Sequence, residues 1–254
     1  MADVLGGIIK AFELLVEGDP GIYGILLRSL FFSGTAIILA MLWGTPIAML
    51  LGLHEFRGKT VVKTIITSFM GIPTVVLGLI LYLIFSKGGP LGFLGLLYTP
   101  GAIMIGQAIL VTPIIISIGV SAIEAVDPEI MSLSKTLGAS ESQAQIAVLK
   151  EAINGVLLAN VASFNRAIAE LGVALLVGGN IANVGNRTDV LTTAISRYTQ
   201  IGEIGFAVAL GILLMVIIFA VNLIVFMARK APSIASFIRL FFSKTKRLIG
   251  DIGR

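Results

Sequence analysis

Two oppositely charged residues stand in an apolar stretch, residues 152–180, that otherwise carries no charge. Arg166 and Glu170 are four positions apart, so their side chains can pair along one face of a helix. Ser163 lies on the same face, and Asn160 lies about 60° away from it at ~100° per residue. If the stretch lies in a membrane, such groups are expected to face a bundle interior or a cavity. These residues predict one of two roles: a polar path or gate through the membrane, or an ion pair that only stabilises the structure. For Glu170 the structural role is slightly favoured.

Other polar side chains lie in three further uncharged stretches and could belong to the same path. Gln107 is deep in one of them, and Thr45, Thr74 and Thr112 each adjoin a proline. Prolines occur inside these stretches at Pro46, Pro73 and Pro113. Each proline removes a backbone hydrogen bond and tends to kink a helix, which could expose carbonyl and hydroxyl groups along a path or at a hinge. Irregular helix packing explains any single one of them equally well.

Several kinds of chemistry are excluded by the residues that the sequence lacks. There is no cysteine and a single histidine, His54, so we expect no catalytic site and no metal site. Gly58-Lys59-Thr60 ends like a phosphate-binding loop, but the first glycine of that motif would have to stand at Leu53. The segment also follows an apolar stretch rather than a β-strand. No ATP site is therefore expected in this chain.

The elements that must position these residues follow from the distribution of charge. The chain is 57% hydrophobic and 13% charged, with a mean hydropathy of +1.03. A soluble domain usually has about 25% charged residues. Five stretches are long enough to cross a bilayer as helices, namely 30–53, 65–85, 99–123, 152–180 and 204–228. The sequence predicts an all-α polytopic membrane protein with one membrane domain over 1–254.

Lysine and arginine predict the orientation of these five spans. One side of the membrane would hold twelve of the eighteen, namely Arg57, Lys59, Lys63, Lys135, Lys150, Arg229, Lys230, Arg239, Lys244, Lys246, Arg247 and Arg254. The other side would hold four, namely Lys10, Lys87, Arg187 and Arg197. We therefore expect residues 1–21 to form an outer or interfacial segment and 229–254 a basic cytoplasmic tail. The net charge of +4 reflects this topology, and no nucleic-acid partner is expected.

A charged segment, residues 127–151, interrupts the apolar stretches and predicts two short helices. Asp127-Pro128-Glu129 is typical of a helix start. Gly138 permits a left-handed helix end, and Ser140-x-x-Gln143 is a capping-box pattern that opens the next helix. Ile130, Leu133 and Leu137 form one apolar stripe on the first helix. That stripe either binds a partner protein or rests on the membrane or on the underside of the bundle.

The same segment resembles the cytoplasmic loop of permease subunits of binding-protein-dependent ABC importers. Gly138 fits the family pattern, and Val148 stands where isoleucine is expected. Ser132-Leu133-Ser134 and Lys150-Glu151 depart from the Glu-Ala-Ala and Leu-Pro of that pattern. Three motifs are typical of the oxyanion branch, namely TLGAS at 136–140, GTP at 44–46 and FNRAIAELGVA at 164–174. ELGVALLVGGNI, followed by LTTAI at 191–195, most resembles tungstate permeases, and the similarity covers 22–228.

The resemblance implies a type I, molybdate-permease-like fold and a role in ATP-driven import of an oxyanion. Tungstate is the anion it favours, with molybdate as the alternative and sulfate or phosphate behind them. It implies a homodimer, two copies of a separate ATP-binding subunit that carries ATP and magnesium, and an extracytoplasmic oxyanion-binding protein. The expected location is a bacterial or archaeal cytoplasmic membrane. Its coupling residues would be Glu129, Ile130, Leu133, Leu137, Gly138, Ala139 and Ser140.

Two other classes of function remain as alternatives. A secondary transporter or channel often has inverted repeats, but five spans do not divide into two halves. A membrane enzyme with metal or thiol chemistry would need the cysteine or the His-Glu-x-x-His ligands that the chain lacks. Residues 190–200 are too short and polar to span, and they suit a short outer helix near the mouth of a path.

Overall fold

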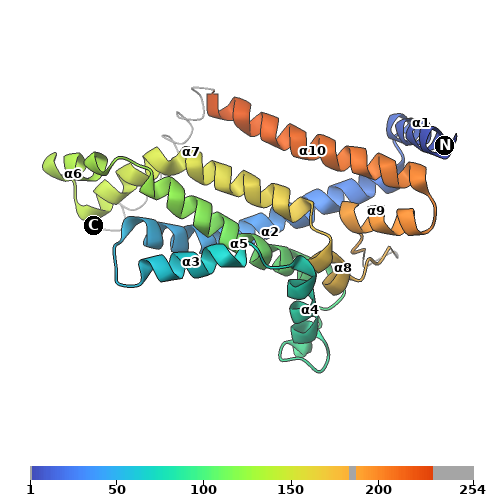
Figure 1. Ribbon diagram of the computed structural model, residues 1–254, viewed down its shortest axis with the longest axis horizontal. Coiled ribbons are helices and arrows are strands. Elements are labelled where there is room, and N and C mark those ends of the chain that lie inside the picture. The colour runs from blue at the N-terminus through green and yellow to red at the C-terminus, as the bar shows by residue number, and fades with distance from the viewer. Residues whose placement is uncertain (1, 183–186, 231–254) are drawn as a thin grey trace, which may run out of the picture. The chain divides into compact units, whose positions relative to one another are not determined.

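The computed structural model describes residues 2–182 and 187–230 and contains helices but no strands among them (Figure 1). The elements are α1 Ala2–Glu17, α2 Pro20–Leu53, α3 Lys59–Phe69, α4 Thr74–Phe85, the 3-10 turn η1 Gly92–Leu94, α5 Pro100–Glu124, α6 Pro128–Thr136, α7 Glu141–Ile168, α8 Gly172–Gly178, α9 Leu191–Gln200 and α10 Ile204–Lys230. The chain divides into two compact units, Met1–Met215 and Val216–Arg254, and all packing given below lies within the first.

Four helices are long and apolar enough to cross a membrane, namely α2, α5, α7 and α10. Two of the expected spans, 99–123 and 204–228, coincide with α5 and α10. The first span begins earlier than expected, at Pro20 instead of Leu30. Asp19 caps this helix, because its carboxylate accepts the amides of Gly21 and Ile22 at 2.8 and 3.0 Å.

The expectation of one continuous helix over 65–85 is wrong. α3 ends at Phe69, α4 begins at Thr74, and their axes differ in direction by 93°. Figure 1 shows α3 lying along α5 and α4 turning away from it. Pro73 is the physical reason, because it cannot donate the backbone hydrogen bond that would continue α3. Met70 and Gly71 close α3 with tight turns onto the carbonyls of Thr67 and Ser68, at 3.1 Å each.

The expected span 152–180 is likewise not one helix. α7 begins inside the charged segment, at Glu141, and runs without interruption to Ile168, and α8 begins only at Gly172. Gly172 lies so close to α4 that an added Cβ would stand 2.9 Å from the backbone nitrogen of Val75. The chain therefore breaks between α7 and α8, and the break allows α8 to pack tightly on α4.

Small residues bring the long helices close together around α5. An added Cβ on Gly52 of α2 would stand 2.8 Å from a side-chain carbon of Ile123, and one on Gly106 of α5 would stand 2.5 Å from Val173 of α8. Close approach through glycine is a common way for helices to associate in a membrane, where apolar side chains gain little by leaving lipid. α5 thus forms the centre to which α2, α7 and α8 are attached.

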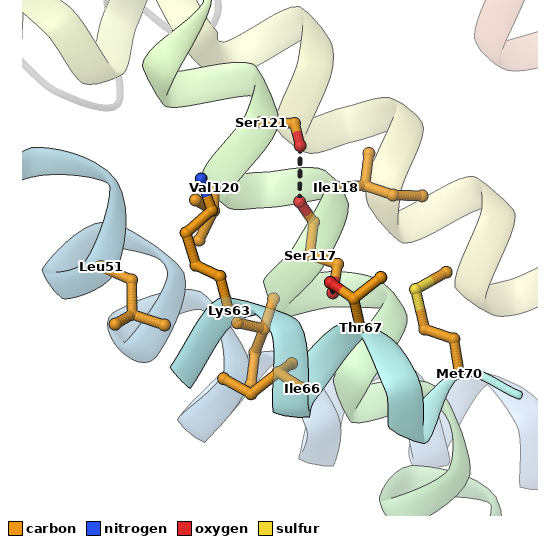
Figure 2. Close-up of a pocket in the computed structure, with 10 residues that line it drawn as sticks. Leu51, Lys63, Ile66, Thr67, Met70, Ser117, Ile118, Val120 and Ser121 are labelled. Atoms are coloured by element: carbon orange, nitrogen blue, oxygen red, sulfur yellow. Dashed lines mark hydrogen bonds between the residues drawn. The ribbon is translucent and has the colours of Figure 1, made fainter. Parts of the chain in front are cut away.

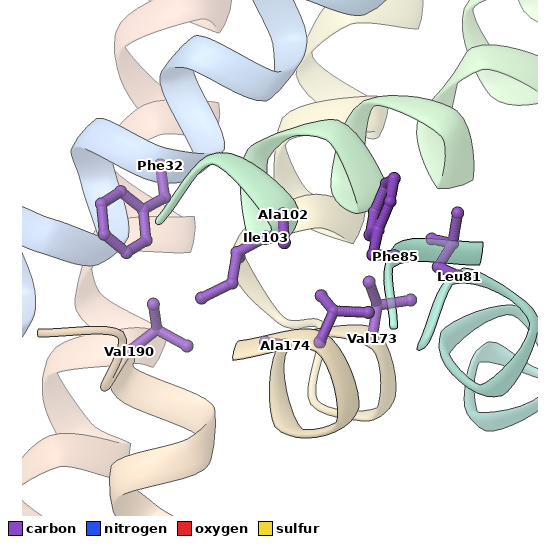
Figure 3. Packing of buried hydrophobic residues seen from close by; sticks show 9 residues of the cluster. Phe32, Leu81, Phe85, Ala102, Ile103, Val173, Ala174 and Val190 are labelled. Carbon is purple, nitrogen blue, oxygen red and sulfur yellow. The ribbon is translucent and has the colours of Figure 1, made fainter. Parts of the chain in front are cut away.

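A buried apolar cluster fixes the position of α8 (Figure 3). Phe85 of α4, Ile103 of α5 and Val173 of α8 meet in it, and Val190 closes the cluster from the segment before α9. Because α8 follows directly after Arg166 and Glu170, this packing also determines where that pair lies.

Candidate functional site: the coupling segment and the α7–α8 break

The start of α6 has the geometry predicted from its sequence. The carboxylate of Asp127 accepts the amide of Glu129 at 2.9 Å, and Pro128 occupies the first turn. Gly138 has φ +85°, which confirms the predicted left-handed stop after α6. Ser140 and Gln143 form the predicted capping box, with reciprocal hydrogen bonds of 3.4 and 3.0 Å. These local features fix the corner between α6 and α7.

The apolar stripe of α6 divides between two environments. Ile130 packs against the cluster of Ile123, Val148 and Ala152, so this end of the stripe rests on the bundle's own underside. Leu133 and Leu137 are 59% and 80% exposed. The structure thus bears out the underside alternative for Ile130 and leaves the two leucines available to a partner. Among the other expected coupling residues, Glu129, Gly138 and Ser140 are exposed and Ala139 is half-buried.

Arg166 and Glu170 form the predicted ion pair, with Arg166 Nη1 3.0 Å from Glu170 Oε2. The carboxylate is almost completely buried, whereas the Arg166 side chain is 39% exposed. Glu170 Oε1 also accepts the amides of Gly172 and Val173 at 2.7 and 3.3 Å. One buried carboxylate therefore pairs with α7 and caps the first turn of α8. This arrangement favours the interpretation that Glu170 stabilises the structure and does not itself line the path.

Sequence reasoning missed this second role of Glu170. The signal was present, because an acidic residue two positions before a short apolar helix is a usual N-terminal pattern. Treating 152–180 as one helix concealed it.

The other predicted path residues are only partly brought together. Gln107 is buried and donates to the carbonyl of Ala167 at 3.0 Å, next to the α7–α8 break. Thr74 faces the same break, since an added Cβ on Gly172 would stand 2.8 Å from its hydroxyl oxygen. Figure 1 shows α4, α5 and α8 meeting in this region. Gln107, Thr74 and Glu170 therefore lie around the break between α7 and α8.

Three predicted path residues form their hydrogen bonds elsewhere. Ser163 is buried and donates to the carbonyl of Ala159 at 2.8 Å. Asn160 donates to the carbonyl of Val156 at 3.0 Å. Thr112 accepts from the indole of Trp43 and donates to the carbonyl of Ala108, both at 2.7 Å.

Two groups of ion pairs between distant parts of the chain were not predicted. Arg28 of α2 pairs with the buried carboxylate of Asp189 at 2.8 Å. At the end of α5 nearest the coupling segment, Glu124 pairs with Lys63 at 2.5 Å and with Lys59 at 3.0 Å. No short-range sequence pattern links these partners, which lie far apart along the chain. Only Lys59 and Glu55, four residues apart and 2.7 Å from each other, could have been paired from spacing.

No group of three His, Asp or Glu side chains suited to a metal ion occurs within the described ranges, 2–182 and 187–230.

Comparison with known proteins identifies the architecture that holds these features. The model of the family described as "Binding-protein-dependent transport system inner membrane component" matches residues 44–231. The chain belongs to this family. It is 37% identical over 226 residues to the tungstate uptake system permease protein TupB of Peptoclostridium acidaminophilum, covering 89% of this chain and 98% of TupB. It is 34% identical over 221 residues to TupB of Campylobacter jejuni, covering 87% and 91%.

A solved structure shares the fold. A chain of the MetNI methionine ABC transporter superimposes with a TM-score of 0.66 at 15% identity, covering 82% of this chain and 94% of that chain. The expected class, an all-helical permease subunit of an ABC importer and not an enzyme, is confirmed by the family and by this fold. The chain is thus a multi-pass inner-membrane component of a binding-protein-dependent transport system, which implies ATPase and substrate-binding partners.

Proposed function

We propose that this permease forms the membrane path of an ATP-driven importer whose substrate is tungstate. The observation that carries the proposal is the 37% identity to a tungstate uptake permease over almost the whole of both chains. A second tungstate uptake permease, at 34% identity over most of the chain, supports the same anion. Molybdate is the alternative, because it is a tetrahedral dianion of nearly the same size.

We further propose that two copies of the chain form the path and that each binds one ATPase subunit through α6. ATP and magnesium would belong to the ATPase. The exposed Leu133 and Leu137 support this docking, because they leave an apolar surface uncovered on the same stripe whose first residue, Ile130, is already packed. In this proposal α6 and the basic tail lie in the cytoplasm and the N-terminus lies outside, which the distribution of lysine and arginine supports. The extracytoplasmic binding protein would then dock on the side of α9.

The path or gate would include some of the seven residues expected from the sequence. Arg166 is the member with a half-exposed cationic side chain, and Glu170 holds it in place. Gln107, Thr74 and Glu170 would act together at the α7–α8 break, since they surround it. Thr112, Asn160 and Ser163 stay as further candidates on α5 and α7.

The test is uptake by the complete transporter in proteoliposomes with ATP inside and the binding protein outside. We expect uptake of radiolabelled tungstate that needs both ATP and the binding protein. Molybdate and sulfate serve as competitors, and an ATPase subunit that binds but cannot hydrolyse ATP serves as the control. Uptake of sulfate or phosphate in preference to tungstate, or uptake without the ATPase, would contradict the proposal.

A further inference from the structure

α3 presents three faces of different chemistry. Its packed face contains Lys59, Lys63 and Ile66, which are buried or half-buried. A second, exposed face is apolar and is here called the apolar face; it consists of Val61, Val62, Ile65 and Phe69. A third, also exposed, carries only hydroxyl side chains and is here called the hydroxyl face; it consists of Thr60, Thr64, Thr67 and Ser68. At ~100° per residue the last two faces point in different directions from the helix axis.

The length of α3 is about half the thickness of a bilayer core. The helix has 11 residues, which gives a length of ~16 Å against a hydrocarbon core of ~30 Å. It begins beside the ion pairs of Lys59 and Lys63 and ends at the 93° bend before α4. A helix of this length that crosses the membrane from the α6 side would end near the middle of the bilayer.

A hollow beside the hydroxyl face contains further hydroxyl groups (Figure 2). It lies between α3 and α5 and has a volume of about 230 Å³. Thr67, Ser117 and Ser121 supply hydroxyl groups to its lining, and Lys63 supplies an ammonium group. Its remaining lining is apolar, with Leu51, Ile66, Met70, Ile116, Ile118 and Val120. The hollow is thus an apolar recess with its polar groups along one edge.

The hydroxyl groups of this edge can donate hydrogen bonds to an anion. Thr67 Oγ1 and Ser117 Oγ are 3.2 Å apart, and one hydrogen bond between two hydroxyls uses only one of their two protons. Ser121 donates to the carbonyl of Ser117 at 3.0 Å. The Lys63 ammonium is partly neutralised by Glu124, 2.5 Å away. The edge therefore offers one neutral hydroxyl donor beside a partly neutralised positive charge.

An exposed hydroxyl face next to an exposed apolar face indicates two different surroundings for one helix. Acyl chains suit Val61, Ile65 and Phe69, but they offer no hydrogen-bond partners to polar side chains. Thr64 and Ser68 donate to carbonyls four residues earlier, at 2.8 Å each, and their lone pairs still face outward. Water or a hydrated solute suits this face better than lipid does.

We infer that the hydroxyl face, together with Ser117 and Ser121, lines the half of the path nearest α6 and that the hollow is a weak oxyanion site on it. The inference deepens the proposed function and rests on it. An oxygen of a tetrahedral oxyanion accepts a hydrogen bond from the proton that the Thr67–Ser117 pair keeps free, and the partly neutralised charge of Lys63 attracts it. A site on a path must bind well enough for entry and weakly enough for release, and a neutral donor satisfies both conditions.

Cysteine accessibility tests the inference directly, because the natural chain has no cysteine. The complete transporter in lipid vesicles would carry Thr64→Cys, Thr67→Cys or Ser117→Cys, with Val61→Cys and Ile65→Cys as controls on the apolar face of the same helix. The probe is an anionic, water-soluble methanethiosulfonate. Only a thiol in contact with water forms the reactive thiolate readily. We expect reaction at least about tenfold faster on the hydroxyl face, and slower labelling of Thr67→Cys when millimolar tungstate is present.

Equal rates on both faces would overturn the path assignment. Faster labelling of the hydroxyl face that tungstate, molybdate and sulfate all fail to slow would overturn the oxyanion site. The labelling does not depend on uptake by the wild-type transporter, so failure of the proposed substrate and failure of this inference give different results.

An uptake measurement provides a second readout. The double variant Thr67→Val with Ser117→Ala removes both hydroxyls of the pair, and we expect oxyanion uptake to fall about tenfold while the ATPase stays bound. Val61→Ala with Val62→Ala is the control, because both residues are exposed on the apolar face of the same helix and lie outside the proposed path. Uptake by the Thr67/Ser117 double variant equal to that of the control would contradict the role of the two hydroxyls.

Discussion

Arg28 and Asp189 form an ion pair in which Nη2 of the arginine lies 2.8 Å from each carboxylate oxygen. Arg28 Nε also donates to the backbone carbonyl of Asp189 at 3.2 Å. Next to this pair, the hydroxyl of Ser29 accepts the amide of Leu191 at 2.7 Å. These contacts fasten the start of α9 to α2, so α9 has a fixed place although only 10 residues long.

Removal of Arg28 should therefore be costly. Arg28→Met leaves the buried carboxylate of Asp189 without a counter-charge, and we expect the free energy of unfolding to fall by ~3–5 kcal/mol. Adding Asp189→Asn should recover part of that loss, because it removes the unpaired charge. Thermal unfolding in detergent measures both effects. Arg57→Met, at an exposed loop arginine, is the control, and a loss as large as that of Arg28→Met would contradict the role of the pair.

The Arg166–Glu170 pair should respond unequally to the loss of its two members. Arg166→Met leaves Glu170 still accepting the amides of Gly172 and Val173, whereas Glu170→Ala removes the cap of α8 and strands the arginine. We expect the greater loss of stability, ~3–5 kcal/mol, from Glu170→Ala. Arg166→Met with Glu170→Gln should cost less than the sum of the two single changes. Folding yield and thermal unfolding of Arg166→Met, Glu170→Gln and the double variant measure the coupling, and additive losses of stability would show that the two residues do not interact.

Lys59 pairs with two carboxylates, and their contributions to the stability of α3 should differ. Its side chain is only 7% exposed, while Glu124 is 32% exposed and Glu55 87% exposed. Exposed ion pairs contribute about 0–1 kcal/mol to the free energy of unfolding, whereas hydrogen bonds to less exposed charged groups contribute ~1.5–3 kcal/mol. Glu124→Gln should therefore destabilise α3 more than Glu55→Gln does. Hydrogen exchange of the α3 amides provides the comparison, and equal protection in the two variants would be the contrary result.

The corner between α6 and α7 depends on Gly138. At φ +85° a β-carbon costs ~1 kcal/mol or more, and valine tolerates this conformation poorly. Gly138→Val should insert into the membrane normally but bind the ATPase more weakly, because α6 shifts relative to α7. Gly138→Asn is the matched variant, since asparagine enters the left-handed region more readily than valine. Equal ATPase retention by the wild type and Gly138→Val in a detergent pull-down would exclude this role.

The features that the sequence predicted correctly are those set by neighbours within a few residues. The caps at Asp127 and Ser140, the stop at Gly138 and the Arg166–Glu170 pair all depend on spacings of two to four residues. Such short-range geometry follows from helix periodicity and backbone sterics alone.

The features that sequence reasoning missed are the turns of the chain between helices and the contacts between distant residues. Hydropathy counts apolar residues but does not show whether a chain crosses the membrane or turns within it, so the bend before α4 and the break before α8 were taken as continuous helix. The partners of Arg28 and Glu124 come from distant parts of the chain, and only tertiary packing brings them together.

The exposed part of the α6 stripe gives the sharpest prediction about the ATPase. Leu133 is 59% exposed, although it lies on the same stripe as the packed Ile130, so a partner's apolar groove would bury it. Truncating a leucine in a well-packed site typically loses ~2–5 kcal/mol, and a charge there loses more by desolvation. Leu133→Asp should therefore release the ATPase in a detergent pull-down while the permease still folds and inserts.

The control for Leu133→Asp must be an exposed residue on another side of the same helix. Ser134 is unsuitable, because it is half-buried and donates to the carbonyl of Ile130 at 2.7 Å. Ser132 is exposed and lies ~100° around the helix from Leu133. Ser132→Asp adds the same charge beside the stripe and should keep most of the ATPase. If α6 instead rests on lipid, both variants will retain the ATPase equally, and the docking role of Leu133 is then wrong.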